Sequence, residues 1–426
     1  DVKTVKLKTV KKNQPTTVEF RKSDLTTGVE LDGATLTVLD KDGNEIDKWT
    51  SVKGEPHIIK RLHVGETYIL REEFAPYGYL KAEEVEFTIT DTAEIQKVEM
   101  KDDVPIGRII INKKGEFLSE VSWNDMVAGA MDSIWGYVTG SLKDVTFEIY
   151  AREDIKAADG ESDDYYKKDE LVATIKTDEL GIARTDDLPL GKYYVVETKA
   201  PEGFVLNPEP VKVALTYQDQ DTPIVEAEAI VGNDRQKVAI SVEKQDAENG
   251  RVLSGAVFGI YNKKDIQANG KVLVKADTLL QEMTSDENGM ATCTLDLPFG
   301  EYYVKELKAP EGFVSSDEVL EFVAEYQGQE TKIVSLQAVK KNEPTTAEFT
   351  KSDLTTGVEL EGARLKVMDK DGNVIDEWTS EKDKPHVIKR LVVGETYTLH
   401  EEFAPYGYLK ATDVTFTVKD TAEVQK

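Results

Sequence analysis

The chain repeats one motif four times, and this motif places an ionisable side chain where a hydrophobic core should form. The pattern is Tyr-x-Leu/Val-x-Glu-x-x-Ala-Pro-x-Gly-Tyr/Phe, with copies that begin at Tyr68, Tyr193, Tyr302 and Tyr397. Tyrosine, the aliphatic residue and glutamate stand at i, i+2 and i+4, so they share one face of a β-strand. An unpaired buried carboxylate is very costly, so each glutamate must be paired or protonated. These glutamates are Glu72, Glu197, Glu306 and Glu401.

A much longer repeat organises the chain. Residues Asn13–Lys97 recur as Asn342–Lys426 without insertion or deletion, at a constant offset of 329 (342 − 13). Three domains therefore form one larger repeating unit. We predict domains at 14–104, 105–235, 236–342 and 343–426. Residues 1–13 match the end of the third domain and are expected to be the last strand of a preceding domain, whereas the fourth domain is expected to lack its last strand.

Hydrophobic periodicity predicts an all-β protein of tandem Ig-like or prealbumin-like sandwiches. Apolar and polar residues alternate over short runs, and turn signals recur every eight to twelve positions. The second domain carries an insertion, 119–142, with apolar residues at Met126, Ala130, Ile134 and Val138. This spacing predicts a short helix packed over the sandwich. An exposed aromatic binding site at Trp123 and Trp135 is the alternative, and the packed insertion is favoured.

Composition excludes several classes of function. The chain has 53 basic and 81 acidic residues and a net charge of -28, which argues against nucleic acid and anionic membranes as partners. It contains no apolar run of transmembrane length. Its single cysteine, Cys293, cannot form an internal disulfide. The four histidines show no catalytic or metal-ligand spacing, so we expect no cofactor, no metal and no turnover of an external substrate.

Each glutamate motif has a lysine upstream on an alternating strand, and the lysine shares its face with an apolar residue two positions earlier. These lysines are Lys22, Lys113, Lys244 and Lys351. A desolvated lysine loses its proton easily and becomes a nucleophile, whereas a desolvated glutamate gains one and can act as a general acid. The last strands offer electrophiles at Asp102, Asn233 and Asn342. The alternative is a buried, hydrogen-bonded polar cluster without a covalent bond.

In these residues the chain resembles the isopeptide-forming B-type repeat domains of Gram-positive collagen adhesins and pilins, also called SpaA-type or prealbumin-like domains. The resemblance implies that a first-strand lysine attacks a last-strand asparagine or aspartate while the glutamate shuttles protons. Carried over, Lys22 bonds to Asp102 through Glu72 and releases water. Lys113 bonds to Asn233 through Glu197, and Lys244 bonds to Asn342 through Glu306, each with release of ammonia. Lys351 and Glu401 are in place, but their partner strand is not in this chain.

Two departures from the family pattern affect individual assignments. The second domain lacks the Leu-x-Gly-Ala stretch of the other domains, and Lys114 stands beside Lys113 as a second possible nucleophile. Strand register favours Lys113. In the third domain one more residue separates the preceding valine from Asn342 than separates the equivalent valine from Asn233. We therefore expect a bulge or a shifted strand end that turns Asn342 inward.

The resemblance implies a structural stalk of an adhesin or pilus-like protein, extracellular and anchored to the cell wall by a segment outside this sequence. A module that binds a host extracellular protein or glycan, chiefly through the second domain, is the alternative. We expect a monomer. A head-to-tail assembly, in which the fourth domain accepts a strand from another molecule, is a further hypothesis.

Overall fold

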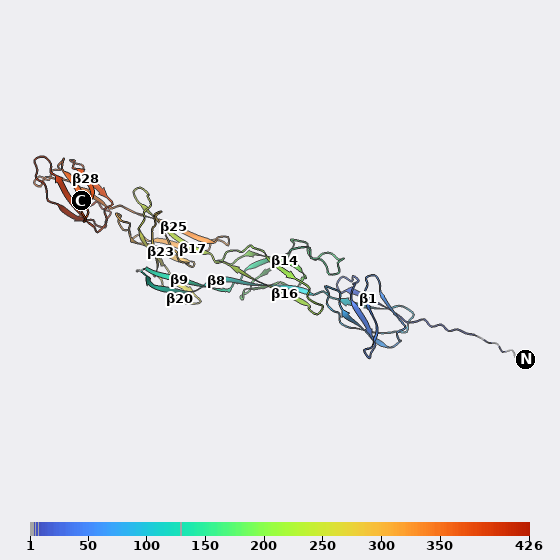
Figure 1. Cartoon of the computed structure of the whole chain (residues 1–426). Helices are drawn as coiled ribbons and strands as arrows, with labels where there is room; N and C mark the ends of the chain where they lie inside the picture. The colour runs from blue at the N-terminus through green and yellow to red at the C-terminus, as the bar shows by residue number, and fades with distance from the viewer. Residues whose placement is uncertain (1–3, 5, 7, 128–129) are drawn as a thin grey trace. The chain divides into compact units, whose positions relative to one another are not determined.

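The computed structural model describes residues 4, 6, 8–127 and 130–426, and strands form its architecture (Figure 1). No helix occurs among these residues, so none of them lies in a helix able to cross a bilayer. The chain divides into two compact units. Unit 1 comprises Asp1–Gly115, Gly140–Pro201 and Leu206–Asn233, and unit 2 comprises Glu116–Thr139, Glu202–Val205 and Asp234–Lys426.

In the first domain, two sheets enclose a hydrophobic core. The strands are β1 (Thr17–Asp24), β2 (Thr35–Leu39), β3 (Glu45–Thr50), β4 (His57–Lys60), β5 (Thr67–Phe74), β6 (Val85–Thr88) and β7 (Gln96–Asp102). One sheet has the order β4-β1-β7 and the other β3-β2-β5-β6. β1 and β7 run parallel, with Lys22 opposite Met100 and Asp24 opposite Asp102. Both sheets contribute to the core, for example Phe20 from β1 and Leu70 from β5.

The second domain repeats this arrangement around an unusually long first strand. Its strands are β8 (Ile106–Val127), β9 (Ala130–Ser141), β10 (Thr146–Ala151), β11 (Leu171–Lys176), β12 (Ile182–Arg184), β13 (Leu188–Pro189), β14 (Gly191–Lys199), β15 (Val211–Leu215) and β16 (Ile224–Asn233). One sheet has the order β11-β10-β14-β15, and the other is built on β8, which pairs with β9, β12, β13 and β16. β16 runs parallel to β8, with Val231 opposite Lys113.

The third domain shows the same two sheets. Its strands are β17 (Lys237–Asp246), β18 (Val257–Asn262), β19 (Ile266–Ala268), β20 (Lys271–Val274), β21 (Leu279–Thr284), β22 (Met290–Thr292), β23 (Gly300–Lys308), β24 (Leu320–Ala324) and β25 (Ile333–Asn342). The sheets have the orders β22-β17-β25 and β21-β18-β23-β24, and β19 and β20 form a separate pair. β17 and β25 run parallel, so the first and last strands of this domain are again neighbours.

The fourth domain repeats the arrangement of the first with a shorter first strand. Its strands are β26 (Thr346–Phe349), β27 (Arg364–Met368), β28 (Val374–Thr379), β29 (His386–Lys389), β30 (Thr396–Phe403) and β31 (Val414–Thr417). β26 pairs with β29, and the other sheet has the order β28-β27-β30-β31. Gln425 forms a parallel bridge with Ala347, at the position where Gln96 pairs with Val18 in the first domain.

The insertion of the second domain is a β-hairpin, so the predicted short helix is wrong. β8 and β9 pair across it, and in β9 the buried Ser133 and Trp135 flank the exposed Ile134. Trp135 is buried, whereas Ile134 and Val138, the residues that suggested a helix, are 52% and 51% exposed. The side chains of Met126 and Ala130 lie outside the described part of the chain. Aromatic and β-branched residues favour a strand here over the four-residue apolar spacing.

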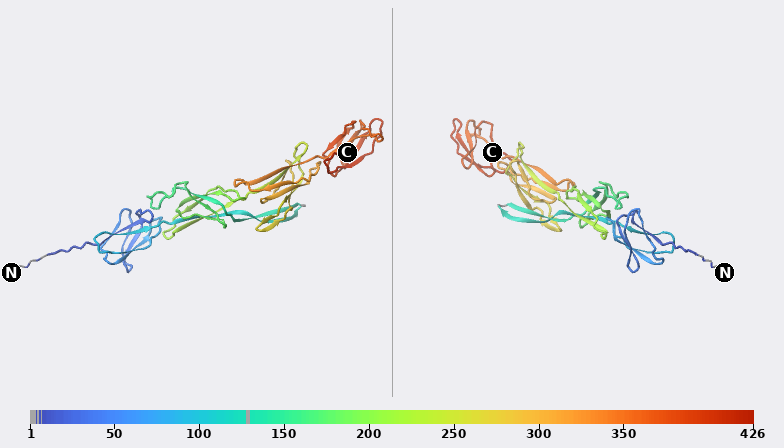
Figure 2. Two further views of the ribbon diagram at one scale, coloured as in Figure 1. Left: turned by 180° about the vertical axis from the view of Figure 1, so that it is seen from behind. Right: turned by 45° about the vertical axis from the view of Figure 1, so that its right-hand side comes forward.

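The described residues of the hairpin segment 116–139 belong to unit 2, where they pack against strands of the third domain (Figure 2). Trp135 belongs to the same hydrophobic cluster as Phe258 of β18. The Tyr137 hydroxyl donates a 2.8 Å hydrogen bond to the Asp296 carbonyl, and the Arg235 guanidinium lies 3.7 Å from the centre of the Tyr137 ring. Trp135 is only 8% exposed, so it cannot form the exposed aromatic site considered above.

Candidate functional site

The paired lysines and glutamates meet between the two sheets of each domain. Lys22, Lys113 and Lys244 lie on the first strands of their domains, and Lys351 lies two residues beyond the end of β26. Each glutamate lies on a strand of the facing sheet: β5, β14, β23 or β30. In the first three domains the last strand runs parallel to the first, with the acceptor residue opposite the position two residues beyond the lysine. Side chains two positions apart share a face, so lysine and acceptor both point toward the glutamate.

The first cluster consists of Lys22, Glu72 and Asp102, and the three side chains are fully buried. The Lys22 amine lies 2.9 Å from Glu72 Oε1 and also contacts Asp102 Oδ1. The Ala82 backbone N–H donates a 2.7 Å hydrogen bond to Glu72 Oε2. Burial raises the pKa of Asp102 to about 7, although the nearby Lys22 opposes this shift. A large fraction of Asp102 is therefore a neutral carboxylic acid near neutral pH.

The second cluster is a closed triangle of Lys113, Glu197 and Asn233. The Lys113 amine lies 2.6 Å from Glu197 Oε2 and donates a 2.6 Å hydrogen bond to Asn233 Oδ1. The Asn233 amide donates a 2.5 Å hydrogen bond to Glu197 Oε1. Burial lowers the pKa of Lys113, which favours the neutral amine. The neighbouring Lys114 instead reaches Ser141 at 3.4 Å, outside this triangle.

The third cluster is looser. Lys244 Nζ lies 3.8 Å from Glu306 Oε1 and donates long hydrogen bonds to the carbonyls of Gln245 (3.5 Å) and Lys340 (3.3 Å). The Asn342 amide donates a 2.7 Å hydrogen bond to Glu306 Oε2. Burial lowers the pKa of Lys244 to about 8, and the charge of Lys340 acts in the same direction. Glu306 and Asn342 are thus hydrogen-bonded to each other, whereas the Lys244 amine lies 3.8 Å from Glu306.

Asn342 faces the interior without the predicted bulge. The parallel register of β17 and β25 runs unbroken from Lys237 opposite Ile333 to Asp246 opposite Asn342. β25 also shows the same alternation of buried and exposed residues as β16, so Lys340 occupies the place of Val231. The prediction was wrong because it aligned Val339 with Val231 and overlooked that a buried lysine can take an inward position.

The fourth domain brings two of the expected residues together. Lys351 Nζ lies 3.1 Å from Glu401 Oε1, and the Ala411 N–H donates a 2.5 Å hydrogen bond to Glu401 Oε2. The Lys351 side chain is 16% exposed, whereas those of the other three lysines are fully buried. No acceptor residue was assigned for this domain, and its lysine is the most accessible of the four.

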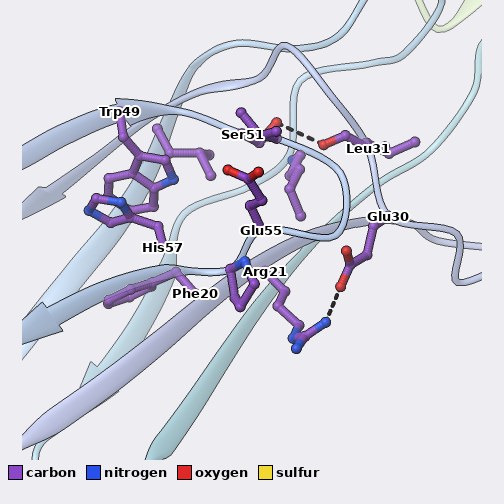
Figure 3. A pocket seen from close by; sticks show the side chains of 12 residues that line it. Phe20, Arg21, Glu30, Leu31, Trp49, Ser51, Glu55 and His57 are labelled. Atoms are coloured by element: carbon purple, nitrogen blue, oxygen red, sulfur yellow. Dashed lines mark hydrogen bonds and ion pairs between the residues drawn. The ribbon is translucent and has the colours of Figure 1, made fainter.

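The first cluster has little room for another molecule. The pocket beside it, drawn in Figure 3, is lined by residues that include Phe20, Trp49 and His57 and encloses about 10 Å³, the space of about one water molecule. The His57 ring stacks on Trp49, and its Nε2 lies 2.9 Å from Asp47. Among the described residues no group of three or more His, Cys, Asp or Glu side chains could hold a metal ion.

One buried residue of these clusters was missed by the sequence reasoning. Lys340 is 1% exposed and lies directly opposite Lys244 on the neighbouring strand. The signal was present in the alternation of β25, because position 340 is two residues before Asn342 and must share its face. The equivalent inward position of the last strand holds Met100 in the first domain and Val231 in the second.

Comparison with known proteins identifies the repeated domain. The sequence matches the family model SpaA, a prealbumin-like fold domain, over residues 16–104, 137–229, 238–338 and 345–426. A trypsin-resistant surface T6 protein of Streptococcus pyogenes serotype M6 is 27% identical over 141 residues, which are 32% of this chain and 23% of that protein. The chain therefore spans less than a quarter of that relative.

The chain also matches solved structures. The Bacillus anthracis TIE protein has a TM-score of 0.52 and 20% sequence identity, with coverage of 98% of this chain and 75% of that chain. BcpA, the major pilin subunit of Bacillus cereus, has a TM-score of 0.30 and 14% identity, with coverage of 78% of this chain and 100% of that chain. At 20% identity the likeness to the TIE protein shows the fold alone.

Proposed function

Because the chain belongs to the SpaA family of prealbumin-like fold domains, a family of structural domains and not of enzymes, we propose that it is a stalk segment of a Gram-positive surface protein. Its domains would strengthen themselves with intramolecular isopeptide bonds. The observation that carries this proposal is the closed contact of Lys113, Glu197 and Asn233 in a buried site. The likeness to a streptococcal surface protein supports an extracellular location, and anchoring to the cell wall is part of the same proposal.

In the second domain, the proposed reaction joins Lys113 to Asn233. The neutral Lys113 amine attacks the Asn233 side-chain carbon, a C–N bond forms, and the amide nitrogen leaves as ammonia. The two Glu197 oxygens contact the attacking and the leaving nitrogen separately, so this residue can accept a proton from one and return it to the other. No external reactant is required.

The other two reactions differ in their leaving groups. Lys22 would attack the neutral acid form of Asp102 and release water, and the raised pKa of Asp102 supports this because a carboxylate is a poor electrophile. Lys244 would attack Asn342 and release ammonia. In both domains the glutamate, Glu72 or Glu306, would transfer the proton.

Such bonds would tie the first strand of a domain to its last strand. They would close loops of 80, 120 and about 98 residues (342 − 244). By analogy with disulfides, each loop of this size corresponds to roughly 4–5 kcal/mol of stabilisation. The linked strands are parallel neighbours, so tension along the chain would pass through the bond and bypass the rest of the sandwich.

The test is the intact mass of the fully denatured chain. Loss of one water and two ammonias is expected, and Glu72→Ala, Glu197→Ala and Glu306→Ala should each remove one of these losses. An unmodified mass would refute the crosslinking mechanism and leave noncovalent polar clusters.

Recognition of a host protein or glycan by the second domain is the weaker proposal, because Trp135 is buried in unit 2. We propose a monomer in solution. Head-to-tail strand donation to the fourth domain would instead give multimers in size-exclusion chromatography at high concentration, and a single monomeric peak would exclude it.

A further inference from the structure

The third domain contains a second buried lysine that the proposed reaction does not use. Lys340 lies opposite Lys244 in the parallel pair of β17 and β25, and both side chains are fully buried. Two neighbouring buried cations are costly, because desolvation and mutual repulsion both disfavour the charged forms. The equivalent positions in the first two domains hold Met100 and Val231. An apolar residue therefore fits this place in the fold, and the lysine needs an explanation.

The contacts of Lys340 lead to the glutamate of the cluster. Its amine donates hydrogen bonds to Ser316 Oγ at 2.8 Å and to the Glu318 carbonyl at 2.9 Å, and it lies 3.0 Å from Glu318 Oε2. The Ser316 backbone N–H in turn donates a 3.1 Å hydrogen bond to Glu306 Oε2. Lys340 is thus hydrogen-bonded to the loop whose Ser316 N–H contacts Glu306, and Glu306 accepts a hydrogen bond from the Asn342 amide.

The same loop contact exists in other domains without a lysine. Ala82 and Ala411, which like Ser316 lie ten residues after their glutamates, donate backbone hydrogen bonds to Glu72 and Glu401. In the third domain this contact is the longest of the three, at 3.1 Å against 2.7 Å and 2.5 Å. The Lys340 side chain therefore contacts this loop in the domain where the backbone hydrogen bond to the glutamate is longest.

The two lysines also differ in their distance to the nearest carboxylate. Lys340 has a carboxylate partner at 3.0 Å, whereas Lys244 has its nearest carboxylate, Glu306, at 3.8 Å. The charged groups that act on Lys244 are Glu306 from β23, Lys340 from β25 and Asp246 from its own strand. Glu306 and Asp246 favour the charged amine, and Lys340 opposes them. A fixed charge on Lys340 therefore favours a neutral, nucleophilic Lys244.

We propose that Lys340 is a positioning residue for the third crosslink, which holds the loop at Ser316 over Glu306 and places a side-chain amine beside the Lys244 amine that attacks Asn342. This inference rests on the proposed function. The chemical step is unchanged: Lys244 Nζ forms a bond to the Asn342 side-chain carbon, and the Asn342 nitrogen leaves as ammonia.

The experiment follows bond formation in the full chain as it refolds. Chain trapped in urea at acidic pH before crosslinking is diluted into buffers from pH 5 to pH 10, and digestion with mass spectrometry measures the peptides joined at positions 244 and 342 over time. The variants are Lys340→Met, Lys340→Arg and Lys341→Met. Methionine occurs at this position in the first domain, so Lys340→Met is compatible with the fold. Lys341 is exposed on the same strand and supplies the matched control.

In the unaltered chain the rate should rise with pH to a midpoint near 8, the pKa of Lys244. Lys340→Met should raise the midpoint by about one pH unit, which lowers the rate at pH 7 about tenfold. Lys340→Arg should restore the midpoint because it restores the charge, and Lys341→Met should change nothing. The bond between Lys113 and Asn233, measured in the same digests, should be unaffected by all three variants.

Three results would overturn the inference while leaving the proposed function intact. The first is an unchanged rate and midpoint in Lys340→Met. The second is a slower reaction with an unchanged midpoint that Lys340→Arg does not improve, which would mean that the side chain only fills space. The third is a digest that joins Lys340 itself to Asn342. Absence of any bond at Asn342 in the unaltered chain would overturn both the inference and the proposed function of this domain.

Discussion

The second and third domains carry the same motif on the same two sheets, yet their polar clusters differ. Lys113 contacts both of its partners at 2.6 Å, whereas Lys244 stands 3.8 Å from Glu306 and donates its hydrogen bonds to backbone carbonyls. The residue opposite each lysine also differs, since Val231 faces Lys113 and Lys340 faces Lys244. The shared motif therefore fixes which residues meet. The lysine amine is placed differently in the two domains, and the residue opposite that lysine on the last strand differs as well.

The largest expected effect is a difference in stability between the variants Glu197→Ala and Glu306→Ala. Glu197→Ala should remove the second crosslink, worth roughly 4–5 kcal/mol by the disulfide analogy, and should also leave Lys113 buried without its carboxylate, at a cost of about 3–5 kcal/mol. Glu306→Ala should cost less, because Lys244 keeps its two backbone acceptors. Calorimetry of both variants, with the exposed Glu202→Ala as control, measures the difference. Equal effects would contradict the comparison.

A second contrast lies in the hairpin, because the described residues of segment 116–139 pack with strands of the third domain. Trp135→Ala should destabilise these strands by about 3–5 kcal/mol, the usual cost of truncating a buried aromatic residue. Hydrogen exchange of the β18 and β21 amides measures this loss. Ile134→Ala, at a 52% exposed neighbour, should stay within about 0.5 kcal/mol. Similar exchange in the two variants would mean that Trp135 contributes nothing to this core.

A third contrast concerns pH. The first crosslink needs neutral Asp102, whose pKa is about 7, so its rate of formation should not continue to rise above pH 7, because the electrophilic acid form is lost there. The third crosslink needs neutral Lys244, whose pKa is about 8, so its rate should fall about tenfold for each unit below 8. Timed mass spectrometry during refolding at pH 6 and pH 9 distinguishes water loss from ammonia loss. Parallel pH profiles for the two bonds would rule out these protonation states.

The smallest expected effect probes how the hairpin is fastened. Tyr137→Phe removes the hydroxyl that donates to the Asp296 carbonyl but keeps the ring beneath Arg235. We expect a loss of about 1 kcal/mol in the protection of the third-domain strands against hydrogen exchange. Tyr406→Phe, at a fully exposed tyrosine, is the matched control. A loss as large as that of Trp135→Ala would mean that the hydroxyl, and not the apolar packing, holds the hairpin.

Much of the fold was predictable because its signals are local and repeated. Period-two alternation predicts the strands, and the match of Asn13–Lys97 to Asn342–Lys426 predicts that the fourth domain copies the first. The hairpin was not predictable in this way. Ile134 and Val138 show helical spacing by chance, and the partner that buries Trp135 lies more than a hundred residues later in the sequence, in Phe258 and its neighbours.

The sequence by itself determined which residue types meet in each domain, because the motif fixes the glutamate to one face of its strand and the alternation of the first and last strands fixes the lysine and its acceptor. Only the tertiary structure decided the register of β25 against β17 and the packing of the hairpin within unit 2. The physical reason is that strand register and core membership depend on contacts between residues far apart in the chain, which no local pattern records.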